Sequence, residues 1–232
     1  MKIIKVKNSG EGFKTCKSLL YEKVSSNTVL FLSGGSTPKS LYESLSREKR
    51  LQIGAVGMID ERYGERLHED SNEKMIRDTG LIERIEERAR FYPILENKDI
   101  EETARDYDET LRFLFNYFPK SVGILGVGID GHTAGIPAIP EISQKILDDK
   151  SSLACFYEDR GVYKKRITQT FLALSRLDLL IVLVFGKEKK ESLGLMFKKG
   201  SEANIPARFF LQKEITDKVV LITDQKLRGE LD

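Results

Sequence analysis

The stretch VLFLSGGSTPKSLYESL (residues 29–45) joins an apolar segment to an amphipathic one through a glycine turn. The four residues 29–32 are apolar and fit a buried strand, while Leu41 and Leu45 recur at helical spacing. A strand that passes through a short turn into a helix is the building unit of a parallel α/β sheet. The uninterrupted apolar strand is typical of a sheet that helices cover on both faces.

The same alternation runs through the rest of the chain. Short apolar runs predict strands at residues 3–6, 29–32, 53–59, 91–94, 122–125, 153–156, 179–185 and 219–222. Apolar positions three or four apart predict helices around residues 13–20, 41–45, 107–118 and 193–197. The pattern therefore predicts a Rossmann-like, doubly wound, mostly parallel sheet in a single α/β domain over residues 1–232. The least regular segment, 136–152, is expected to be a loop or short helix near a site.

The composition excludes several classes of protein. With 38 basic and 36 acidic residues the formal net charge is +2, which gives no electrostatic footprint for nucleic acid. The longest apolar run, residues 179–185, is too short to span a membrane. The first ten residues have no secretory core, so we expect a cytoplasmic protein. Cys16, Cys155 and two histidines lack metal-ligand spacing, and we expect no metal.

Three polar, glycine-containing or charged motifs each follow directly on an expected strand. They are SGGSTP (residues 33–38), DER (60–62) and GVGIDGH (126–132). The carboxyl ends of parallel strands lie at one edge of the sheet, which is where open α/β sheets bind ligands. We therefore expect the three motifs to share one site.

In SGGSTP, Gly34 and Gly35 permit a tight turn and the close approach of a ligand. Ser36 or Thr37 is expected to cap the following helix, with the proline at its first position. Free amides and the helix dipole at such a turn favour phosphate, although a plain capped turn would have the same sequence. The motif lacks two glycines of a Walker A loop, which excludes a nucleotide P-loop.

In GVGIDGH, Gly126, Gly128 and Gly131 match G-x-G-x-x-G, but the prolines that follow would interrupt the helix of a dinucleotide-binding motif. Asp130 lies two residues before His132. A carboxylate can orient an imidazole and stabilise its protonated form, so His132 is a candidate general base. A structural histidine is the alternative, and the expected position at the sheet edge favours the base.

Charged residues complete the candidate site. Asp60 can anchor substrate hydroxyls or a loop amide, and Arg62 can bind an anion or pair with Glu61. A salt-bridged loop is an equal alternative for each of them. Arg166 precedes a helical-looking segment, and Lys189 follows the strand predicted at 179–185, beside another helix start.

These stretches together resemble the 6-phosphogluconolactonase family, in the wider group that includes glucosamine-6-phosphate deaminase/isomerases. The matching segments are FLSGGSTPKSLYESL (31–45), IDERYGERLHEDSNEKM (59–75), GILGVGIDGHTAG (123–135), KRITQTF (165–171) and GKEK (186–189). They occur in the family's order and span most of the chain.

The resemblance implies hydrolysis of 6-phosphoglucono-1,5-lactone to 6-phosphogluconate in the pentose phosphate pathway, with no metal, cofactor or nucleotide. It implies that His132 activates water with support from Asp130, and that Arg166 and Lys189 bind the phosphate. The other substrate-binding residues expected are Gly34, Gly35, Ser36, Thr37, Asp60, Arg62 and Gly131. The expected partner is a phosphosugar, without nucleic acid or membrane, for a monomer or small homo-oligomer.

Two stretches depart from the family pattern. HTAGIPA (132–138) replaces the usual HTASLFP, and YGERLHED follows DER. Gly135, in place of serine, is expected to widen or loosen the wall that faces the substrate. Deaminases carry a glutamate five residues after the histidine, where this chain has Pro137, so a deaminase or isomerase ranks second. A non-catalytic sugar-phosphate sensor, which has no need of Asp130 and His132, is the third alternative.

Overall fold

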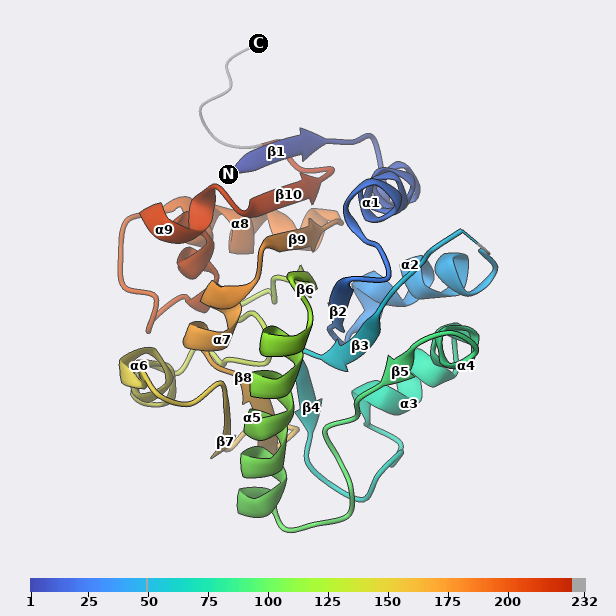
Figure 1. Cartoon of the computed structure of the whole chain (residues 1–232). Coiled ribbons are helices and arrows are strands. Elements are labelled where there is room, and N and C mark those ends of the chain that lie inside the picture. Colours follow the sequence, from blue (N-terminus) through green and yellow to red (C-terminus); the bar gives the residue numbers. More distant parts are fainter. Residues whose placement is uncertain (49, 227–232) are drawn as a thin grey trace.

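In the computed structural model, which describes residues 1–48 and 50–226, seven parallel strands form the central sheet in the order β1-β10-β9-β6-β2-β3-β5 (Figure 1). Their bounds are Lys2–Lys5 (β1), Thr28–Leu32 (β2), Ala55–Met58 (β3), Arg90–Phe91 (β5), Lys120–Gly126 (β6), Leu179–Val184 (β9) and Val219–Thr223 (β10). Every residue of β2, β3 and β10 is buried, as expected when helices cover both faces. The predicted doubly wound parallel sheet is confirmed.

Helices form where the apolar spacing predicts them. The α-helices are Ser9–Lys23 (α1), Ser36–Ser46 (α2), Asn72–Arg77 (α3), Leu81–Glu86 (α4), Ile100–Tyr117 (α5), Pro140–Asp148 (α6), Phe171–Arg176 (α7), Lys190–Phe197 (α8) and Lys213–Thr216 (α9). Two 3₁₀ segments cover Lys187–Lys189 and Pro206–Leu211. Cys16 and Leu20 of α1, and Leu111 and Leu114 of α5, are buried on the faces that the spacing indicated. The irregular stretch 136–152 contains α6.

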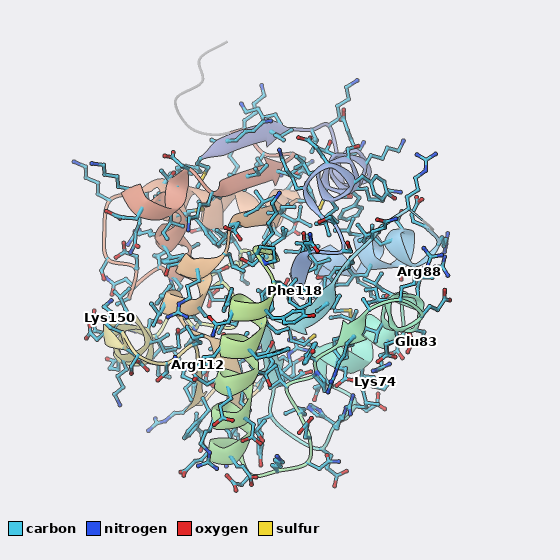
Figure 2. The ribbon with its side chains drawn as sticks, in the orientation of Figure 1. Lys74, Glu83, Arg88, Arg112, Phe118 and Lys150 are labelled. Carbon is cyan, nitrogen blue, oxygen red and sulfur yellow. The ribbon has the colours of Figure 1, made fainter. Side chains whose placement is uncertain are left out.

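The outer faces of the helices carry charges of both signs. Figure 2 shows Lys74, Glu83 and Arg88 around α3 and α4, and Arg112 on α5. Phe118, just past α5, turns back and packs against the core. No helix within the described residues has the length and apolar character needed to cross a membrane.

A second, antiparallel sheet was not predicted. Its strands are Asp60–Arg62 (β4), Lys165–Gln169 (β8) and Ala154–Glu158 (β7), in the order β4-β8-β7 (Figure 1). A salt-bridged loop was one alternative for DER, and the strand predicted at 153–156 was expected in the main sheet; both expectations were wrong. Residues 164–170 do lead into a helix, α7, as expected, but residues 165–169 form the strand β8. The pairing of β4 with β8 joins residues about a hundred positions apart, so no local pattern indicates it.

The two sheets share one hydrophobic core. Ile167 of β8 and Tyr157 of β7 belong to the same cluster as Phe31 of β2 and Ile124 of β6. The described residues therefore form a single α/β domain, in which the small sheet lies beside the carboxyl ends of β2, β3 and β6.

Candidate active site

A cleft of about 270 Å³ opens at the carboxyl ends of β2 and β6. Its walls come from the edge of the parallel sheet on one side and from the small antiparallel sheet on the other. The predicted residues that line it are Gly34, Gly35, Ser36, Thr37, Asp60, Arg62, His132, Arg166 and Lys189. Asp130 and Gly131 lie in the loop that carries His132 and are outside this lining.

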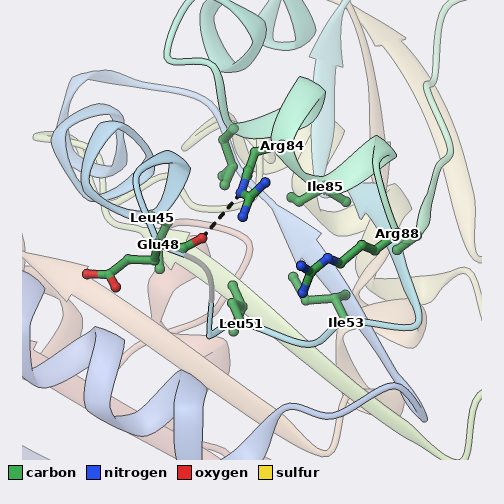
Figure 3. Close-up of a pocket in the computed structure, with 9 residues that line it drawn as sticks. Leu45, Glu48, Leu51, Ile53, Arg84, Ile85 and Arg88 are labelled. Carbon is green, nitrogen blue, oxygen red and sulfur yellow. Dashed lines mark hydrogen bonds between the residues drawn. The ribbon is translucent and has the colours of Figure 1, made fainter.

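A smaller hollow of about 30 Å³ lies near the amino end of β3, away from the motifs (Figure 3). Its floor is apolar, with Leu45, Leu51 and Ile53, and Arg84 donates from Nε to the backbone carbonyl of Glu48 at 3.4 Å. The described residues that line it include no histidine and no glycine turn at a helix start. We therefore place the functional site in the cleft at the carboxyl ends of β2 and β6, which the predicted motifs line.

The SGGSTP turn leads from β2 into α2 through backbone geometry alone. Gly35 is the N-cap residue, with φ of 97°, and no side chain caps the helix. The prediction that Ser36 or Thr37 is the cap was wrong, because Gly35, with its positive φ, is the N-cap and the helix starts at Ser36. The first amides of this eleven-residue helix therefore have no side-chain cap. Because Ser36 and Thr37 line the cleft, the helix start provides an anion-binding end there.

His132 and Asp130 form a close pair at the end of β6. His132 Nδ1 lies 2.6 Å from Asp130 Oδ1, and the backbone N–H of His132 donates to the same oxygen at 3.1 Å. An ionised carboxylate only accepts, so Nδ1 carries the proton and Nε2 remains the basic nitrogen. The hydrogen bond from His132 lowers the pKa of Asp130 to about 2, which keeps the carboxylate charged at neutral pH.

Two glycines shape the loop that holds this pair. Gly131 N donates to Gly128 O at 3.1 Å, and Gly128 N donates to His132 O at 2.8 Å. Gly131 has φ of 87°, which a glycine adopts without strain. A Cβ on Gly128 would lie 2.0 Å from His132 Nδ1, so the imidazole occupies the space that a side chain would fill. The glycine pattern therefore builds a histidine loop and no dinucleotide turn.

The small sheet contributes a buried ion pair. Asp60 is 5% exposed, and its Oδ2 accepts from Arg166 Nη1 at 3.0 Å. Asn72, a cleft residue that the sequence did not indicate, donates from Nδ2 to Asp60 O at 2.9 Å and to Oδ2 at 3.3 Å. A Cβ on Gly34 would lie 1.9 Å from Asn72 Oδ1, so Asn72 also packs against the SGGSTP turn.

Glu61 serves the fold instead of pairing with the Arg62 guanidinium. Its buried carboxylate accepts from the backbone N–H groups of Arg62, Asn72 and Glu73 and from Ser71 Oγ, at 2.6 to 3.0 Å. Burial raises the pKa of Glu61, and these four donors oppose that rise. The expected pairing with Arg62 was one of two alternatives and is not found. The Arg62 guanidinium lies at the cleft, where Nη1 donates to Asp70 O at 2.7 Å.

Lys189 adds a cation on the opposite wall. Its Nζ donates to Val127 O at 2.8 Å, which ties the 3₁₀ segment Lys187–Lys189 to the loop that precedes His132. Burial lowers the pKa of Lys189. Gly135 has φ of 70°, and a Cβ there would lie 2.6 Å from Asp60 Oδ2. The glycine therefore brings this wall close to Asp60, which corrects the expectation of a looser wall.

Metal ligands do not gather in the described part of the chain. Residues 1–48 and 50–226 contain no group of three or more histidine, cysteine, aspartate or glutamate side chains placed to hold a metal ion.

Comparison with known proteins places these features in context. Residues 14–221 match the family of glucosamine-6-phosphate isomerases/6-phosphogluconolactonase. The chain is 31% identical to a 6-phosphogluconolactonase of Helicobacter pylori, over 90% of this chain and 89% of the relative. A solved 6-phosphogluconolactonase from Thermotoga maritima is 26% identical, with a TM-score of 0.73 over 95% of this chain and 97% of that one. One from Shewanella baltica is 22% identical, has a TM-score of 0.79 over 96% and 95%, and supports the fold.

Proposed function

Because the chain belongs to the family of glucosamine-6-phosphate isomerases and 6-phosphogluconolactonases, we propose that it hydrolyses 6-phospho-D-glucono-1,5-lactone to 6-phosphogluconate. The observation that carries the proposal is the His132–Asp130 pair at the edge of a cleft that also presents Arg166 and Lys189. The small molecule that fits these groups is a phosphosugar. The reaction belongs to central carbohydrate metabolism, and we also propose a cytoplasmic location.

In this mechanism His132 Nε2 removes a proton from a water molecule. The resulting hydroxide attacks the lactone carbonyl, and hydrogen-bond donors in the cleft stabilise the oxyanion. Asp130 stabilises the imidazolium that forms. As the bond between the carbonyl carbon and the ring oxygen breaks, the protonated His132 returns its proton to that oxygen. One water is consumed, and no cofactor is needed because a lactone is an activated ester.

The phosphate is held by cations and by the start of α2. Arg166 and Lys189 bind the dianion, with Arg62 beside Arg166. The turn residues Gly34, Gly35, Ser36 and Thr37 lie against the substrate, where the free amides and the dipole of α2 favour negative charge. Gly131 does not line the cleft, and it contributes by shaping the loop that carries His132.

The cleft favours a lactonase over a deaminase. Asp60 is the one acidic residue among those that line the described cleft, and it is paired with Arg166. A deaminase needs a further carboxylate for ring opening and proton transfer, and Pro137 stands at the position of that residue. A parallel assay with glucosamine-6-phosphate should therefore release no ammonia.

The test is hydrolysis of freshly generated 6-phosphogluconolactone at mildly acidic pH, where spontaneous opening is slow. We expect the wild type to accelerate the reaction and His132→Ala to lower kcat by roughly 10²–10⁴-fold, the usual contribution of a general base. Binding of 6-phosphogluconate, measured by calorimetry, should persist in the variant. Near-wild-type turnover of His132→Ala would remove His132 from the mechanism. Tight binding without any acceleration by the wild type would indicate a sensor.

A further inference from the structure

Tyr163 carries an aromatic ring on which two cleft arginines meet. The Cζ atom of Arg62 lies 4.2 Å from the ring centroid, and that of Arg166 lies 5.4 Å from it. Both arginines line the cleft, whereas Tyr163 is not among the residues that line it. The tyrosine therefore contacts the candidate substrate site through the two guanidinium groups.

The two arginines need such a partner because they lie directly opposite each other. Arg62 pairs with Arg166 in the register of β4 and β8, and like charges at opposite positions repel. Asp60 offsets the charge of Arg166 at 3.0 Å. Arg62 donates to a backbone carbonyl, and its buried Nε has no hydrogen-bond partner among the described residues. The negative face of the ring attracts both cations.

The hairpin between β7 and β8 holds the ring in place. Asp159 N donates to Lys164 O at 2.8 Å, which closes the hairpin, and Gly161 N donates to Asp159 Oδ1 at 2.6 Å. Tyr163 thus stands just before the start of β8. The hairpin that leads into β8 and Arg166 therefore also positions the backbone of Tyr163, whose ring contacts both guanidinium groups.

We propose that Tyr163 is a positioning residue of the phosphate subsite, which orients Arg62 and Arg166 toward the same phosphoryl group. This inference rests on the proposed function. A phosphate dianion accepts paired hydrogen bonds from guanidinium groups, and a guanidinium that is stacked beforehand loses less freedom on binding. Tyr163 then acts on affinity for the phosphorylated substrate and has no part in bond breaking.

The test compares Tyr163→Ala, Tyr163→Phe and Val162→Ala. Val162 is the neighbouring hairpin residue and is 90% exposed, so its variant is a matched control that should behave as wild type. For Tyr163→Ala we expect KM for the phosphorylated lactone and Kd for 6-phosphogluconate to rise roughly three- to tenfold, with kcat nearly unchanged. Tyr163→Phe keeps the ring and should restore both constants.

Unphosphorylated gluconolactone separates positioning from a general structural role. Its kcat/KM should be unaffected by Tyr163→Ala; an equal loss on both lactones would overturn the inference. Unchanged KM and Kd for the phosphorylated ligands in Tyr163→Ala would also overturn it. Because Kd for 6-phosphogluconate is measured without turnover, it decides the role of Tyr163 even if the wild type fails to hydrolyse the lactone, which would count against the proposed function alone.

Discussion

The two walls of the cleft are built in different ways. On the wall at the edge of the parallel sheet, short turns between residues that are close in sequence place Gly35 at the start of α2 and hold Asp130 beside His132. On the wall of the antiparallel sheet, Asp60 and Arg166 meet although they are 106 positions apart. The first wall offers backbone amides, a base and the Lys189 cation, and the second offers the side chains of Asp60, Arg62 and Arg166. This difference suggests that bond breaking depends on the local turns, whereas recognition of the phosphate also depends on the long-range pairing.

The largest effect is expected when the histidine loop is disturbed. Gly128→Ala would place a Cβ 2.0 Å from His132 Nδ1 and force the imidazole out of its position, so kcat should fall by roughly 10²-fold or more, approaching the loss of a general base. The measurements are steady-state hydrolysis of 6-phosphogluconolactone and the Kd for 6-phosphogluconate, which reports binding of the phosphorylated ligand without turnover. That Kd should change little.

Gly194→Ala provides the matched glycine control. Gly194 lies within α8, and a Cβ there meets no atom within 4 Å. Activity should equal that of the wild type, and the helix should gain stability, since alanine is favoured over glycine in a helix interior. Full activity in Gly128→Ala would show that the imidazole can move without loss, which contradicts the role given to this wall.

A smaller effect, of a different kind, is expected on the antiparallel wall. Arg166→Ala removes a charge-assisted contact to the phosphate, so KM for the phosphorylated lactone should rise roughly ten- to a hundredfold while kcat changes little. Lys165→Ala, the adjacent exposed cation on the same strand, is the control and should leave KM unchanged. An unchanged KM in Arg166→Ala would place the phosphate elsewhere in the cleft.

The two walls also differ in how far the sequence reveals them. The strands β2, β6 and β9 each contain an apolar run, and the motifs at their ends contain glycines whose conformations are required locally. The strand–turn–helix pattern therefore predicted the parallel sheet and the region of the site. It missed the exact start of α2, because a positive φ at Gly35 is a property of the folded turn.

The antiparallel wall leaves a weaker local signal, although its strand β7 overlaps the strand predicted at 153–156. β4 has only three residues, all charged, and becomes a strand because β8 pairs with it. Asn72 follows the N-cap Ser71 and looks like any first residue of a helix, although its side chain bonds to Asp60. Tyr163 lies outside every segment that suggested a function. Such residues are identified by contacts between distant parts of the chain, which periodicity does not encode.

Asp130 offers the smallest and most specific test of the first wall. The pKa of Asp130, about 2, lies below the ordinary value of an aspartate. The stability that its charge contributes is therefore fully present above about pH 4 and is lost as the pH falls from about 4 toward 2. Asp130→Asn retains an acceptor for His132 Nδ1 but removes the negative charge that favours the imidazolium. We expect kcat to fall roughly three- to tenfold, less than for loss of the base itself.

The split between kcat and KM in this variant shows whether the Asp130 charge acts on the chemistry. Removal of the carboxylate takes away the negative charge that stabilises the imidazolium, so kcat should fall. KM for the phosphorylated lactone should stay the same, because Arg166 and Lys189 are unaltered. An unchanged kcat would mean that Asp130 only shapes the loop through its bond to the His132 backbone N–H. A lower kcat with an unchanged KM would separate the charge that supports the base from the groups that bind the phosphate.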